Sequence, residues 1–272
     1  MGYTSTNKQF IRFNTTQGAS CTNYLIDTGG DRTEMSDNLI IRTIGNASPQ
    51  EIADGMIKVS GSANVEVQDY TLLQLCKRNS TTDKLTEFDV EAGDYTRSKK
   101  HIYCKVDSVD FSCNAGEVLK STVNWKGRTY DTGATSVTHS PSSDAVLKWH
   151  HATITGLHST EITSFSLSIN NNVDWLPLVK AGSPDARAAD YMKEGEESVT
   201  LNAKFTTPSG VDLAAASLSY ISSVVITFAG TNTVKFTLSN LKMKQEAIDL
   251  SPGEIEEFGI DYDMKSFAIA NS

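Results

Sequence analysis

The chain repeats part of its own sequence once, with a period of about half its length. A glycine and four residues at identical offsets from it recur in each copy. The first set is Gly55, Val59, Ser60, Ala63 and Val65, and the second is Gly195, Val199, Thr200, Ala203 and Phe205. Only two copies are present, so a solenoid is excluded and one module duplicated in tandem is predicted, with a pseudo-symmetric structure.

Two further blocks repeat in the same order along the chain. Val109–Ser112, Gly116 and Trp125 return as Ile248–Ser251, Gly253 and Tyr262, and Thr22, Tyr24 and Ile26 align with Thr163, Phe165 and Leu167. The shift, meaning the difference in residue number between a position and its repeat, ranges from 137 to 141. We therefore predict two tandem modules, residues 1–140 and 141–272. Their boundary falls in a Ser- and Thr-rich stretch that contains Pro141.

Alternation of apolar and polar residues predicts an all-β fold. The pattern covers residues 59–67, 165–169, 199–205, 234–238 and 260–264. A period of two places one face of each strand in a core and the other in water, which is typical of antiparallel sheets. One short helix is expected in each module, at Tyr70–Cys76 after Asp69 and at Leu213–Leu218 after Asp212.

The composition argues against a protein that grips nucleic acid. The 272 residues include 24 Lys and Arg against 33 Asp and Glu, a net charge of −9. Neutralising phosphates requires clustered basic side chains, which an acidic chain does not favour. No stretch approaches the roughly 18 apolar residues of a membrane span. The four cysteines lack C-x-x-C spacing and are expected to be buried thiols.

Two Asp-Thr-Gly triplets, Asp27–Gly29 and Asp131–Gly133, raise the possibility of an aspartic protease. In that class two carboxylates share a proton at a pseudo-twofold axis, so they must occupy equivalent positions. The repeat instead places Asp27 over Ser168 and Asp131 near Ala268, so the triplets are not equivalent. Asp-Thr-Gly also suits an ordinary turn. The protease stays open as the less favoured alternative.

No other motif indicates catalysis or a bound cofactor. His150, His151 and His158 are the closest approach to a metal-binding cluster, but adjacent strand residues point to opposite faces. There is no Gly-rich phosphate loop and no Gly-x-Ser-x-Gly elbow. We predict that the chain is not an enzyme and has no catalytic, cofactor-binding or metal-binding residue.

Three segments are expected to lie outside regular structure. The stretch Asn79–Lys100 is polar and is expected to be an exposed loop. Two long segments, about 29–54 and 170–194, separate predicted strands, and loops of that length are usually functional. We predict that they contact other chains or stacked rings through Pro49, Trp175, Leu176, Pro177, Pro184 and Arg187.

The segments that repeat resemble the tail tube proteins of long-tailed bacteriophages. The resemblance rests on Phe165–Asn172, on Pro184 and Arg187, and on Glu194–Phe205, with Cys104–Ser112 through Ala115 to Gly127 in the first module. It extends over roughly residues 20 to 270. It implies two tandem tube-type β-sandwich or barrel modules, each with a flanking helix, whose hairpins join an oligomeric barrel around a channel.

The resemblance also implies partners and a location. The chain would be a virion protein, assembled in the host cytoplasm and not bound to a membrane. It would form stacked rings that conduct DNA during ejection, with a tape measure protein and a tail terminator as partners. The duplication predicts three chains per ring with pseudo-six-fold symmetry, and the net charge predicts an acidic lumen that does not bind duplex DNA. A two-domain adhesin or carbohydrate-binding β-sandwich is the alternative.

Overall fold

A computed structural model describes most of the chain. The described residues are 10–14, 23–24, 26–36, 39–41, 48, 51–53, 56–68, 70, 73–93, 98–132, 145–157, 161–176, 191–206, 220–249 and 257–271. We refer to 10–132 as the first half and 145–271 as the second half. In the described part of the chain, no helix is long and apolar enough to cross a membrane.

The described elements are almost all strands, which confirms the prediction of an all-β fold. In the first half they are β1 (Phe10–Asn14), β2 (Asn23–Tyr24), β3 (Ile26–Ser36), β4 (Leu39–Ile41), β5 (Glu51–Ala53), β6 (Ile57–Glu66), the 3-10 turn η1 (Leu73–Cys76), β7 (Phe88–Gly93), β8 (Ser98–Asn114), β9 (Lys120–Gly127) and β10 (Thr129–Thr132). In the second half they are η2 (Trp149–His151), β11 (Ala152–Thr155), β12 (Ile162–Asn170), β13 (Val173–Leu176), β14 (Tyr191–Glu194), β15 (Ser198–Phe205), β16 (Ile221–Ala229), β17 (Thr233–Asp249) and β18 (Glu257–Ala270).

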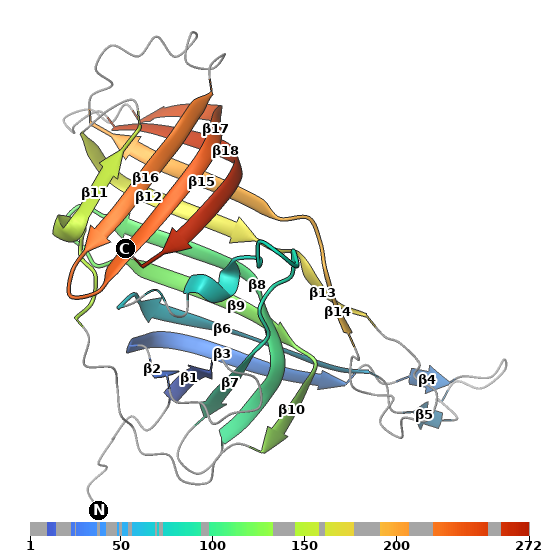
Figure 1. Cartoon of the computed structure of the whole chain (residues 1–272). Helices are drawn as coiled ribbons and strands as arrows, with labels where there is room; N and C mark the ends of the chain where they lie inside the picture. The colour runs from blue at the N-terminus through green and yellow to red at the C-terminus, as the bar shows by residue number, and fades with distance from the viewer. Residues whose placement is uncertain are drawn as a thin grey trace, which may run out of the picture.

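Both halves have the same strand order, and all of their pairs are antiparallel. The first half runs β1-β7-β8-β9-β6-β3, and the second runs β11-β16-β17-β18-β15-β12. The two are joined where β8 pairs with β12, from Ser108↔Asn170 to Asn114↔Ser164. The strands of both halves therefore continue as one sheet, from β3 in the lower part of Figure 1 to β17 and β18 at the top.

The register repeats as well as the order. Gly61 lies opposite Trp125 between β6 and β9, and Leu201 lies opposite Tyr262 between β15 and β18. The shifts for these strands, 140 and 137, are those seen in the sequence. A Cβ on Gly61 would lie 2.4 Å from the Trp125 ring. Of the two equivalent pairs, the one with the larger aromatic residue, Trp125, therefore has glycine opposite it, and the one with Tyr262 has leucine.

Irregularities in the strands occur at equivalent places in the two halves. An extra residue interrupts β8 at Asp107 and β17 at Lys244, a shift of 137. Tyr103 and Asn240, related by the same shift, have left-handed backbone angles, with φ of 57° and 54°. The sequence alignment of Val109 with Ile248 is therefore displaced by two residues.

The first strand of each half is aligned differently from the sequence expectation. Bulges at Thr28 in β3 and Thr163 in β12 give a shift of 135. The alignment of Tyr24 with Phe165, a shift of 141, is therefore wrong by six residues. The reason is the sequence of β3, which places polar residues where β12 has a regular apolar row.

One core of buried side chains extends through both halves. It contains Val109, Phe111, Leu167, Leu201 and Phe236, each at most 1% exposed. The rings of Phe111 in β8 and Phe236 in β17 lie 5.2 Å apart, so the halves share aromatic contacts as well as a sheet. Three cysteines, Cys76, Cys104 and Cys113, are free and buried, as expected, and Cys21 lies outside the described residues.

Several expectations about local structure need correction. The helix expected at Tyr70–Cys76 is a single 3-10 turn at Leu73–Cys76, and Leu213–Leu218 lies outside the described residues, as does the predicted boundary near Pro141. The stretch Asn79–Lys100 is not an exposed loop, because it contains β7 and the start of β8. Its carboxylates Asp89 and Glu91 are buried and paired, Asp89 with Lys100 at 3.1 Å and Glu91 with Arg12.

The two long segments between strands contain β-hairpins. In the first, β3 continues to Ser36 and β4 pairs with β5. In the second, β13 pairs with β14. The expectation of little regular structure in 29–54 and 170–194 is therefore wrong for the described parts of both segments.

Truncating the aromatic contact between the halves is expected to destabilise the whole chain. Phe111→Ala removes a fully buried ring, which costs about 3–5 kcal/mol of unfolding free energy. Ser112→Ala, on the exposed face of the same strand, is the control and should change it by less than about 0.5 kcal/mol. Urea unfolding followed by fluorescence and circular dichroism measures both. A loss below about 1 kcal/mol for Phe111→Ala would contradict a shared core.

Candidate functional surface

The joined sheet has a continuous polar face. On seven of its strands the residues opposite the core are polar and at least partly exposed. They are Asp31 and Thr33 in β3; Ser60, Ser62 and Asn64 in β6; Thr122, Asn124 and Lys126 in β9; Ser108, Asp110 and Ser112 in β8; Ser164, Ser166 and Ser168 in β12; Thr200, Asn202 and Lys204 in β15; and Asp261 and Asp263 in β18. Small hydroxyl and amide side chains predominate, with charges of both signs between them.

Many of these side chains bond to one another across the strands. The Ser62 hydroxyl donates to the Asp31 carboxylate at 2.7 Å, and the Thr122 hydroxyl donates to the Asn64 amide oxygen at 2.9 Å. Further bonds join Asn124 to Ser108 at 3.0 Å, Asn202 to Asp261 at 2.6 Å, and Ser168 to Asp110. The last of these crosses from one half to the other. The polar face is thus held in place by its own hydrogen bonds.

A second feature is the seam at which the hairpin β13–β14 of the second half lies on the first half (Figure 1). The Trp175 indole N–H donates to the carbonyl of Gly127 at 2.9 Å. Lys126 donates to the carbonyl of Val173 at 2.6 Å, and its ammonium lies 5.2 Å from the Trp175 ring. The bulge residue Asp107 accepts the Val173 N–H at 2.8 Å.

The carboxylate of Glu194 anchors the other strand of this hairpin. It accepts hydrogen bonds from Arg78 at 3.2 Å and from the Leu85 backbone N–H at 3.1 Å, and it pairs with Lys105. The Glu194 side chain is only 9% exposed. Removing any one of these donors would leave part of the buried charge without a partner, so Glu194 fixes the hairpin against the first half.

The predicted contact residues are only partly described. Trp175 and Leu176 lie in β13, where Trp175 is half-buried with its N–H bonded inside the chain, and Leu176 is exposed. Pro49, Pro177, Pro184 and Arg187 lie outside the described residues. Their role between chains stays a prediction. Lys126, Asp107 and Glu194 were not expected from the sequence, because the repeat marks strands and not the contacts between them.

The Asp-Thr-Gly triplets are not brought together. Asp27 lies in β3 opposite Val65, and Asp131 lies in β10 opposite Lys100. Neither strand pairs with the other. Among the residues that the structure describes, no group of three His, Cys, Asp or Glu side chains is placed to hold a metal ion. His158 lies outside them.

One buried ionisable cluster lies beneath the polar face of the first half. His101 is 1% exposed. Its Nδ1 accepts the Trp125 indole N–H at 3.1 Å, and its Nε2 lies 2.9 Å from a Glu34 oxygen. Both bonds form only when His101 is neutral and carries its proton on Nε2. Burial lowers the pKa of His101, against the opposing effect of Glu34.

The second half has apolar residues in place of this cluster. By the shifts of 135 and 137, Ile169 replaces Glu34 and Leu238 replaces His101, and both are fully buried. The cluster contains no nucleophile, and its groups are satisfied by one another. We interpret it as a structural feature that distinguishes the two halves.

The geometry defines a class of protein, an all-β chain whose main continuous surface is a self-bonded polar sheet face. A family model described as phage tail tube protein matches residues 11–264. The chain therefore belongs to the phage tail tube protein family, which confirms the resemblance found in the sequence. It is a structural component of the virion tail, in a family whose members assemble into a tube. A search among curated proteins finds no match.

Acid is expected to weaken the first half through His101. Below the ordinary histidine pKa of 6.5 the unfolded chain takes up a proton that folded His101 resists, so stability falls as the pH drops. Replacing His101 with glutamine keeps a donor and an acceptor without the titration. The wild type should therefore lose more unfolding free energy than His101→Gln between pH of about 7.5 and about 5.5.

Urea titrations at both pH values provide this comparison. Equal slopes for wild type and His101→Gln would contradict a buried neutral histidine.

Proposed function

We propose that three copies of this chain close into a ring of six halves, and that rings stack into the tail tube through which DNA passes during ejection. The observation that supports this most strongly is the internal junction between β8 and β12, which joins two equivalent halves by antiparallel pairing. The same junction, repeated between chains, would close a ring. A tape measure protein and a tail terminator are the further partners that this role implies.

The two ends of the joined sheet have edges suited to that pairing. One edge of β3 pairs with β6, and no other described strand pairs with its opposite edge. In β17, the segment Gln245–Asp249 pairs with β18 on one side. On its other side β17 pairs with β16 only as far as Leu241, so no described strand pairs with that edge of Gln245–Asp249. Unpaired edges of this length are a template for further strands.

The internal junction also supplies a register for the junction between chains. Ser168 pairs with Asp110 inside the chain. By the shift of 135, Ser168 corresponds to Thr33, and by the shift of 137, Asp110 corresponds to Ala247. The equivalent junction between chains would therefore pair Thr33 of one copy with Ala247 of the next. The same translation places Asp31 opposite Asp249. This like-charge pair would oppose closure, and salt would screen it.

The resulting barrel is wide. Each chain contributes eight strands to its wall, which are β3, β6, β9, β8, β12, β15, β18 and β17. With strands about 4.8 Å apart and tilted by about 40°, three chains give a backbone diameter of about 50 Å. We infer that the polar face lines this channel, because the opposite face is buried in the core of each chain.

The chemistry of the polar face suits a conduit. Its hydroxyl and amide groups are engaged with one another, and its lysines are interspersed with aspartates instead of forming a basic stripe. DNA would find no row of cations for its phosphates. The polar face is less acidic than the net charge of the chain predicts. DNA would therefore bind it weakly for two reasons: its polar groups already bond to one another, and its acidic residues repel phosphates.

Electron microscopy with image reconstruction tests the proposed function. Purified protein, or tails containing it, should show stacked rings with three chains each and a pseudo-six-fold wall. Rings with six whole chains would overturn the three-fold arrangement. If the protein were absent from the tube of such tails, the proposed function itself would be overturned.

A further inference from the structure

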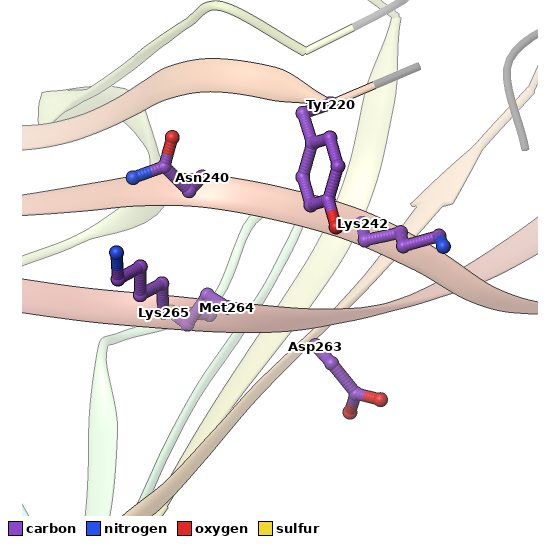
Figure 2. Close-up of a pocket in the computed structure, with 6 residues that line it drawn as sticks. All are labelled: Tyr220, Asn240, Lys242, Asp263, Met264 and Lys265. Atoms are coloured by element: carbon purple, nitrogen blue, oxygen red, sulfur yellow. The ribbon is translucent and has the colours of Figure 1, made fainter. Parts of the chain in front are cut away.

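We propose that a hollow on the second half of each chain is the docking site for the β4–β5 hairpin of the next copy in the ring. The hollow lies between β16, β17 and β18 and has a volume of about 440 Å³ (Figure 2). It is lined by Tyr220, Asn240, Lys242, Asp263, Met264 and Lys265. The proposal rests on the proposed function, because it requires that copies assemble side by side.

The hollow is the counterpart of a surface that is already occupied in the first half. The shift of 137 converts Asn240, Lys242, Asp263, Met264 and Lys265 into Tyr103, Lys105, Lys126, Gly127 and Arg128. Tyr220 becomes Glu87 by a shift of 133, which the pairs Phe88↔Cys104 and Ile221↔Leu241 support. The left-handed residues Tyr103 and Asn240 mark the same point in both surfaces.

In the first half this surface binds the hairpin β13–β14. Lys126 bonds to the Val173 carbonyl, the Gly127 carbonyl accepts the Trp175 N–H, and Lys105 pairs with Glu194. Arg128 pairs with Glu87 and lies 4.8 Å from the Tyr103 ring, so the other counterparts hold one another beside the hairpin. In the half where this surface is occupied, it therefore binds a β-hairpin.

The matching hairpin in the first half is β4–β5. Its cross-strand pairs are Leu39↔Ala53, Ile40↔Ile52 and Ile41↔Glu51. In β13–β14 the pairs are Asp174↔Lys193, Trp175↔Met192 and Leu176↔Tyr191. A shift of 135 relates β4 to β13 and a shift of 140 relates β5 to β14. These two shifts convert the three β4–β5 pairs into the three β13–β14 pairs.

The burial of equivalent residues shows which hairpin is docked. Met192 in β14 is 7% exposed, in a cluster with Leu85 and Val173, whereas its counterpart Ile52 in β5 is 64% exposed. Tyr220, beside the hollow, is 65% exposed. In Figure 1 the β4–β5 hairpin lies beyond the ends of β3 and β6, away from the rest of the chain. Ile52 on the hairpin and Tyr220 on the hollow are thus both exposed in a single chain.

The two sites differ in a way that would keep the hairpins from exchanging. In the occupied site Lys126 donates a hydrogen bond to the Val173 carbonyl of the hairpin. In the hollow Asp263 takes the place of Lys126. A carboxylate cannot donate that hydrogen bond, so β13–β14 would lose it in the hollow, and the docking inside a chain differs from the docking between chains.

Photocross-linking from the hairpin tests the proposal. A benzophenone amino acid at position 52 would be placed in protein grown with either light or heavy nitrogen, and the two mixed before assembly. Mass spectrometry should find mixed-isotope cross-links to peptides that contain Tyr220, Lys242 or Met264, in assembled particles only. Cross-links from assembled particles to other segments would overturn the docking while leaving the proposed function intact. Failure of the wild type to assemble would count against the proposed function.

Charge substitutions provide a second measurement. Tyr220→Asp, at a side chain that is 65% exposed, should leave a folded monomer by circular dichroism and raise the protein concentration needed for assembly by about tenfold or more, a change equivalent to about 1.4 kcal/mol. Thr153→Asp adds the same charge to the exposed strand β11 and should assemble as the wild type does. Combining Tyr220→Asp with Ile52→Lys should recover assembly. Normal assembly of Tyr220→Asp would overturn the proposal.

Discussion

The antiparallel pairing of β8 with β12 is the contact on which the rest of the structure depends. It joins two halves with the same strand order into one sheet, so that the core behind the sheet and the polar face before it both run from one half to the other. Among the described strands it also leaves unpaired edges at β3 and at the end of β17. Under the proposed function, the internal pairing of β8 with β12 is the model for the pairing between neighbouring chains.

Divergence between the halves then becomes informative. Where the second half has Ile169 and Leu238, the first has Glu34 and His101 in a buried hydrogen-bonded cluster. Where the first half has Lys126 bonded to the β13–β14 hairpin, the second has Asp263 in the lining of the hollow. Equivalent backbones thus carry different contacts, which in the proposed ring would make the internal junction differ from the junction with another copy.

The sequence predicts the elements that have regular alternation and misses those without it. Val199 to Phe205 alternates strictly and forms β15, and its repeat with β6 has the observed shift of 140. In β3, Arg32 and Glu34 interrupt the apolar row, since they bond to Ala92 and His101 in the layer behind, so that strand was aligned wrongly. Glu194 and Lys105 lie far apart in the sequence, and no local pattern brings them together.

Hydrogen exchange of the monomer and of assembled particles tests the central claim most directly, namely that the internal junction is repeated between chains. Amides in 30–35 and 245–249 should exchange much more slowly after assembly, because each segment gains a paired strand. Amides in 108–114 and 164–170 should be protected in both states, because their pairing exists within one chain. Unchanged exchange in 30–35 and 245–249 after assembly would contradict the account.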